Sequence, residues 1–356
     1  MHPMPGPPAT LDARHAKPTA RRVARSAAPK AQLLANEPCE WQWPDHDHWL
    51  AEQARAHAAE VHTAAERFGI RLPPFDALRA ALPARAEYEH RTAGAGHECR
   101  RLEYLSDGLR VKGYLWKSRN TGARRRPVVV YNRGGCGEYA RLTPRTREGF
   151  FDFLDAGFVV VGSQYRGNDG GEGRDEIGGA DVNDVINLVA LLPRIDCADP
   201  GHVFVLGDSR GGMMTCMALA RGVAARAAAT VGCESDLALN AMRRPELFRI
   251  YVERVPGFMH HAPGLLRERS ARHWPERLRS PLLLLHGGAD WRVDAAEAID
   301  FAAALHAARR PFQLSLFAGD DHALSFNWRE RDRQTIDWFR RHMDAGAPGN
   351  TGTRIA

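Results

Sequence analysis

Short apolar segments with the composition of buried strands alternate with helical segments between Cys99 and Phe317. We expect strands in eight of them: Cys99–Tyr104, Val111–Trp116, Val128–Tyr131, Phe158–Ser163, Val203–Leu206, Ala227–Val231, Pro281–His286 and Gln313–Phe317. This alternation predicts an α/β fold with a mostly parallel sheet and helices on both faces. In such folds, the residues that act on a ligand lie in loops at the carboxyl ends of the strands.

A serine between two glycines follows one of these strands. The segment Gly207-Asp-Ser209-Arg-Gly211 separates the strand that ends at Leu206 from an apolar helical segment over 212–220. Glycines on either side allow the strained turn that exposes a nucleophilic serine between a strand and a helix. The pattern alone is a weak signal, because 33 of the 356 residues are glycine. Whether Ser209 is a nucleophile therefore depends on whether the chain also offers a suitable acid and histidine.

Candidate partners follow two later strands. Asp290 comes after the strand over 281–286, and His322 comes after the strand over 313–317. The order serine, aspartate, histidine is that of α/β-hydrolases, in which the histidine takes the serine proton and the aspartate orients the histidine. We therefore predict an α/β-hydrolase fold with Ser209, Asp290 and His322 as catalytic residues. Asp294 is the alternative acid.

The negative oxygen formed during attack on a carbonyl group needs hydrogen-bond donors. The backbone N–H of Arg210, directly after the serine, is one predicted donor. A second is expected from Arg133, Gly134 or Gly135, in the loop after the strand over 128–131. The two arginine side chains could also donate, or attract a substrate carboxylate or phosphate. The sequence leaves open whether the Arg133 side chain reaches the oxyanion.

Several motifs together resemble the catalytic domain of the prolyl oligopeptidase family of serine peptidases, over residues 98–343. They are, in order, Tyr165-Arg-Gly167, Asp181-Val-Asn-Asp184, the segment 207–215 and the segment 286–293. The resemblance implies that the bond cleaved is a peptide bond. It also implies that Phe248, Tyr251 and Val293 line a specificity pocket. Relatives usually carry a β-propeller, yet the roughly 100 preceding residues contain no blade-length repeat.

These observations predict a serine hydrolase that cleaves small peptides through an acyl-enzyme. A carboxylesterase acting on small esters is the alternative, and a non-catalytic binding protein with the same fold is a third hypothesis. No cofactor is expected, because the glycine-rich segment 168–173 lacks the Lys-Ser/Thr of a phosphate-binding loop. No metal is expected either, since Asp45-His-Asp-His48 adjoins a predicted helix start and is interpreted as a capping segment.

Three further segments are predicted outside the catalytic domain, which is expected to span 98–345. Residues 1–40 are rich in proline and alanine and are predicted to be a disordered basic tail. Residues 41–97 are predicted to be a helical extension that docks through Leu50, Ala54, Ala58, Val61 and Ala65, with a lid over the site as one hypothesis. Residues 346–356 are expected to form a flexible tail.

Charge and cysteine usage bear on partners and location. Six basic residues and one acid in residues 1–30 account for five of the six formal positive charges of the chain. The rest is nearly neutral, so no nucleic-acid partner is expected. Neither a signal peptide nor a membrane span is evident, and the six cysteines lack paired or zinc-type spacing. A cytoplasmic protein with no membrane partner is predicted, while its oligomeric state stays open.

Overall fold

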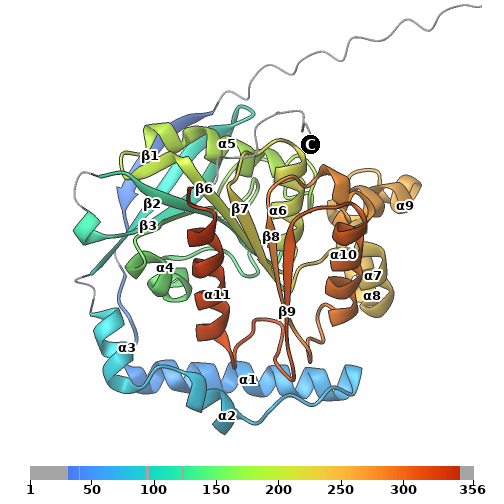
Figure 1. Ribbon diagram of the computed structural model, residues 1–356, viewed down its shortest axis with the longest axis horizontal. Coiled ribbons are helices and arrows are strands. Elements are labelled where there is room, and N and C mark those ends of the chain that lie inside the picture. Colours follow the sequence, from blue (N-terminus) through green and yellow to red (C-terminus); the bar gives the residue numbers. More distant parts are fainter. Residues whose placement is uncertain (1–30, 40, 94–95, 122–123, 345–356) are drawn as a thin grey trace, which may run out of the picture.

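The computed structural model describes residues 31–39, 41–93, 96–121 and 124–344, and its centre is a nine-stranded sheet (Figure 1). The strand order is β1-β2-β3-β5-β4-β6-β7-β8-β9. The strands are β1 (Gln32–Pro38), β2 (His97–Ser106), β3 (Leu109–Ser118), β4 (Arg126–Asn132), β5 (Val159–Ser163), β6 (Ala198–Asp208), β7 (Ala227–Val231), β8 (Leu282–Gly287) and β9 (Phe312–Phe317). Strands β4 to β9 run parallel, whereas β1, β2 and β3 pair antiparallel. The predicted α/β fold and all eight predicted strands are confirmed.

Helices cover both faces of the sheet. The helices are α1 (His46–Phe68), α2 (Phe75–Ala81), α3 (Arg85–Thr92), α4 (Phe151–Asp155), α5 (Val182–Leu191), α6 (Arg210–Ala220), α7 (Leu237–Arg243), α8 (Pro245–Arg254), α9 (Phe258–Arg269), α10 (Ala295–Ala307) and α11 (Trp328–Arg341). In β4, Val128 and Val130 belong to the apolar cluster under α5, α6 and α10, while Val129 belongs to the cluster under α4 and α11. Both faces of the central strands are therefore buried, as expected for a parallel sheet between helices.

The amino-terminal region departs from the prediction of a tail over 1–40. Gln32–Pro38 form β1, which pairs antiparallel with β2 at the edge of the sheet. Disorder is therefore wrong for these seven residues, because backbone pairing with a neighbouring strand can order a segment whose side chains are not strongly apolar. Residues 1–30 and the predicted tail at 346–356 lie outside the described residues.

The three helices α1, α2 and α3 form the predicted helical extension, and α1 runs beneath β9 and α11 (Figure 1). Its docking face differs from the predicted alanine-rich stripe, of which Ala58 and Ala65 are exposed. The buried residues of α1 are instead His46, Trp49, His57 and Ala64. Large rings with polar edges bury more surface than alanine and still hydrogen-bond, as Trp49 Nε1 does by donating to Glu148 at 2.6 Å.

The segment before α1 caps the start of this helix. Asp45 is the N-cap of α1, and its carboxylate accepts a hydrogen bond from the His48 N–H at 2.9 Å. The interpretation of this segment as a cap is therefore confirmed.

Among the helices of the described residues, none is both long and apolar enough to cross a lipid bilayer.

Candidate active site

Ser209 lies at the turn between β6 and α6, in a conformation that few non-glycine residues adopt. Its backbone has φ 58° and ψ −125°. Such strain costs about 1–3 kcal/mol and persists only where the surrounding structure enforces it, often at functional sites. The Ser209 N–H donates to the carbonyl of Val231 at 2.8 Å, which ties the turn to the end of β7. The turn therefore presents Ser209 at the carboxyl edge of the sheet.

The glycines around Ser209 are required by close packing. A Cβ at Gly211 would overlap the carbonyl of Asn132, and a Cβ at Gly207 would overlap the carbonyl of Gly211. A Cβ at Gly134 would lie 3.2 Å from the Cβ of Ser209, so the loop after β4 passes against the serine. This loop is therefore close enough to supply a backbone donor beside the Arg210 N–H.

His322 and Asp290 meet although they lie 32 positions apart in the sequence. Nδ1 of His322 lies 2.7 Å from Oδ2 of Asp290. A carboxylate can only accept, so Nδ1 carries the proton and Nε2 is left free to take one. The other Asp290 oxygen accepts the N–H groups of Arg292 at 2.8 Å and Val293 at 3.0 Å. Asp294, the alternative acid, caps α10 instead and pairs with Arg243.

Electrostatics reinforce this pair. Burial would raise the pKa of Asp290, but the charge of His322 and hydrogen bonds from His286 and His322 outweigh it and hold that pKa well below its usual range. Burial likewise opposes the charged form of His322, yet the Asp290 carboxylate more than offsets it and raises the pKa of His322. The aspartate therefore stays ionised and stabilises an imidazolium on its neighbour.

Gly232 holds the histidine in place, a role that was not predicted from the sequence. It follows β7 with φ 55°, and a Cβ there would lie 2.8 Å from both Cε1 and Nδ1 of the His322 ring. Any larger residue would displace the imidazole. Its position after an apolar strand, at the edge where the other site residues lie, was the available signal.

The Arg133 side chain is buried and supports the backbone. Its exposed fraction is 1%. The guanidinium donates to the carbonyls of Gly134, Gly137, Tyr139 and Gln164 at 2.9–3.3 Å, so that all five N–H groups have acceptors. No donor is left for an oxyanion. The question that the sequence left open is thus answered by these bonds: the Arg133 side chain supports the loop, and the N–H groups of Gly134 and Gly135 remain the candidate donors there.

The Arg210 side chain is likewise committed within the protein. Its guanidinium donates to Asp175 at 2.6 and 2.9 Å, to Asp181 at 2.6 Å and to the carbonyl of Gly135 at 2.8 Å. The two aspartates neutralise it, so it is not an anchor for a substrate carboxylate or phosphate. This network was not predicted from the sequence, because the partners lie about 30 residues upstream and meet Arg210 only in the fold.

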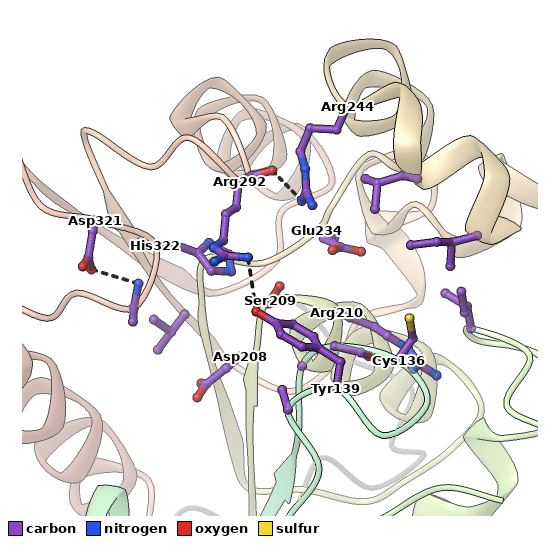
Figure 2. A pocket seen from close by; sticks show the side chains of 18 of the residues that line it. Cys136, Tyr139, Asp208, Ser209, Arg210, Glu234, Arg244, Arg292, Asp321 and His322 are labelled. Carbon is purple, nitrogen blue, oxygen red and sulfur yellow. Dashed lines mark hydrogen bonds between the residues drawn. The ribbon is translucent and has the colours of Figure 1, made fainter. Parts of the chain in front are cut away.

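A cavity of about 660 Å³ adjoins Ser209 and His322 (Figure 2). Of the three predicted pocket residues, only Tyr251 lines it, together with Leu247 and Ile250 of the same helix, α8. Phe248 points away, is 47% exposed and contacts Phe258. Val293 belongs to the loop after β8 and is fully buried, and its carbonyl accepts a hydrogen bond from the ring of His286. The helical spacing of α8 brings residues 247, 250 and 251 to the cavity and turns Phe248 outward.

Helix α1 borders this cavity through Glu60. Glu60 lines it and accepts a hydrogen bond from Trp291 Nε1 at 2.8 Å, and it pairs with Arg292. Arg292 also contacts the hydroxyl of Tyr139 at 3.4 Å, and Figure 2 shows this contact beside Ser209. The amino-terminal extension thus contacts the loop that carries Asp290. No group of three or more potential metal ligands occurs in the described part of the chain.

A serine on a strained strand-to-helix turn, which lines the same cavity as a histidine at the carboxyl edge of an α/β sheet, is typical of a serine hydrolase with the α/β-hydrolase fold. A family model described as the prolyl oligopeptidase family matches residues 146–346, which is more than half of the chain. The chain belongs to the prolyl oligopeptidase family, and it is a serine peptidase.

Two relatives are similar to this chain in sequence. The uncharacterized peptidase YtmA of Bacillus subtilis is 28% identical over 239 residues, which cover 67% of this chain and 91% of YtmA. The human acylamino-acid-releasing enzyme is 26% identical over 216 residues, which cover 52% of this chain and 28% of that enzyme.

Two solved structures share the fold. A puromycin-hydrolyzing peptidase from Mycobacterium tuberculosis has a TM-score of 0.59 at 24% identity, over 68% of this chain and 38% of its own. An acylaminoacyl peptidase from Pyrococcus horikoshii has a TM-score of 0.62 at 18% identity, over 76% of this chain and 45% of its own. The chain thus spans less than half the length of these two peptidases.

Proposed function

We propose that this peptidase cleaves small peptides through an acyl-enzyme, with Ser209 as the nucleophile, His322 as the general base and Asp290 as the residue that orients the histidine. The observation that carries the proposal is the 2.7 Å contact between His322 Nδ1 and Asp290 Oδ2 beside the cavity that Ser209 lines. This contact fixes the imidazole tautomer that leaves Nε2 able to accept the serine proton.

The reaction proceeds in two halves. His322 takes the proton of Ser209 as its oxygen attacks the substrate carbonyl, and the resulting oxyanion accepts hydrogen bonds from the N–H of Arg210 and of Gly134 or Gly135. The intermediate collapses as His322 gives the proton to the departing amine. Water, activated by the same histidine, then attacks the acyl group and releases Ser209.

The cavity and its cover favour small substrates. A volume of about 660 Å³ is typical of sites that enclose small molecules. Glu60 of α1 borders the cavity and bonds to both Trp291 and Arg292, so α1 restricts the approach of long or folded chains. An ester would react through the same residues and release a better leaving group, so the assay compares the two substrate classes.

The test measures kcat/KM for aminoacyl and short peptidyl p-nitroanilides and for p-nitrophenyl esters. We expect anilide cleavage, and we expect Ser209→Ala to lower it at least about a thousandfold without changing the melting temperature. Asp290→Asn should lower kcat by roughly 10³–10⁴-fold through the wrong tautomer. The matched variant Asp294→Asn should retain activity, since asparagine also caps helices. Activity that survives Ser209→Ala would refute the mechanism, and turnover of esters alone would indicate an esterase.

A further inference from the structure

Glu234 places a carboxylate inside the cavity, next to the nucleophile. It follows β7 by three residues, and its N–H lies 3.4 Å from the carbonyl of Ser209. Its side chain lines the same cavity as Ser209 and His322. Figure 2 shows it between the segment that carries Arg244 and the turn that carries Ser209. A group that enters this cavity from a substrate therefore meets Glu234 close to the bond under attack.

Within the described part of the chain, this carboxylate lacks a partner. Its exposed fraction is only 8%. Among the described residues, none donates a hydrogen bond to it, and no cation lies within ion-pair distance of it. Burial raises the pKa of Glu234, although the charges of Arg244, His322 and Arg210 oppose that rise. A buried carboxylate without a partner is unfavourable, so a site that keeps one is poised to gain free energy from a ligand that pairs with it.

The two arginines whose charges act on Glu234, Arg244 and Arg210, are already engaged elsewhere. Arg210 is neutralised by Asp175 and Asp181, at 2.6 Å from each. Arg244 pairs with Glu246 at 3.2 Å and donates to the carbonyl of Arg292 at 3.3 Å. Neither guanidinium lies within ion-pair distance of Glu234, so the Glu234 carboxylate can still pair with a cation that enters the cavity.

The surrounding walls define what would fit. Leu247, Ile250 and Tyr251 of α8 give the cavity an apolar side, and the Tyr251 hydroxyl is buried without a hydrogen-bond partner among the described residues. An apolar wall with a carboxylate and a hydroxyl complements a substrate group that has a hydrocarbon stem and a cationic, hydrogen-donating tip.

We propose that Glu234 forms a specificity subsite for a cationic group of the substrate, an ammonium or guanidinium, adjacent to the scissile bond. This inference rests on the proposed peptidase mechanism and names its preferred substrates. The cation can come from the side chain of the residue whose carbonyl is attacked, as in lysine, or from a free α-amino group. Both sources supply a cation that donates hydrogen bonds. The substrates of the experiment must therefore distinguish a side-chain cation from a free α-amino group.

The experiment uses four p-nitroanilides: lysine and its uncharged analogue norleucine, each with a free and with an acetylated α-amino group. If the side chain supplies the cation, acetyl-lysine should exceed acetyl-norleucine at least about tenfold in kcat/KM, as one buried charge pair allows. If the α-amino group supplies it, free norleucine should exceed acetyl-norleucine by a similar factor. Glu234→Gln, which keeps the shape of the side chain, should bring that ratio close to one.

Glu253→Gln is the matched control, because Glu253 lies on the exposed face of α8 and its substitution makes the same change in net charge. It should keep the ratio. The inference is overturned if both ratios are near one in the unsubstituted enzyme, or if Glu234→Gln leaves them unchanged while acetyl-norleucine is still cleaved. If no anilide is cleaved, the proposed function fails instead. The inference is then decided by calorimetric binding of lysine amide and norleucine amide to the Ser209→Ala and Ser209→Ala/Glu234→Gln proteins, where equal affinities would overturn it.

Discussion

Replacing Arg210 with methionine should destabilise the protein, because it leaves two buried aspartates without their cation. The Arg210 side chain is 3% exposed, and those of Asp175 and Asp181 are 1% and 0% exposed. Removing one partner of such a buried network costs about 3–5 kcal/mol. At about 2.1 cal/mol/K per residue, roughly 300 ordered residues give an unfolding entropy near 0.6 kcal/mol/K, so the melting temperature should fall by about 5–8 °C.

Thermal unfolding followed by circular dichroism at neutral pH measures this change. Arg333→Met is the control, because Arg333 forms an ion pair on the exposed face of α11 and its loss should change the melting temperature little. The triple variant Asp175→Asn/Asp181→Asn/Arg210→Met should be more stable than the single variant, since no buried charge remains unpaired. The reasoning is refuted if Arg210→Met melts like Arg333→Met, or alters only KM, as an arginine that anchors substrate would.

Two further predictions concern catalysis. Asp290 raises the pKa of His322, and the neutral imidazole is the active base. We therefore expect kcat/KM to fall as the pH drops through a value above the ordinary histidine pKa of about 6.5. A pH–rate profile with its midpoint below about 6.5 would contradict the assigned pair. Glu60→Ala removes the bonds from α1 to Trp291 and Arg292. These bonds stabilise the contact between α1 and the loop by about 1 kcal/mol. Without them, kcat/KM for a quenched fluorescent decapeptide should rise about three- to tenfold relative to kcat/KM for a dipeptide anilide. Glu66→Ala, on the exposed side of α1, should leave that ratio unchanged, and an equal ratio in both variants would show that α1 does not restrict access.

Some features of this protein follow from local sequence. Apolar β-rich segments between helical segments specify a parallel sheet buried on both faces, and this pattern is local enough to locate all eight strands of the α/β domain. The glycines at 207 and 211 mark the turn at Ser209, because a side chain at either position would overlap neighbouring backbone. Since parallel strands end at one edge of a sheet, the positions of Asp290 and His322 after their strands are enough to predict that both lie near Ser209.

Other features depend on contacts between distant residues, and no local pattern specifies them. The side-chain roles of Arg133 and Arg210 were open in the sequence, because an arginine bonds whatever acceptors the fold brings within reach. Which face of α8 lines the cavity is decided by packing, which buries Tyr251 there and leaves Phe248 at the surface. The ordering of β1 likewise comes from backbone pairing with β2, about 65 residues away along the chain.

The sequence by itself therefore determined the fold class and the candidate nucleophile, base and acid, since these depend on short-range periodicity and on the common edge of parallel strands. Tertiary structure alone decided which charges are neutralised and which remain available. That outcome depends on burial and on partners far apart in the chain: Asp175 and Asp181 neutralise Arg210, while Glu234 lies in the cavity beside Ser209 without a partner among the described residues.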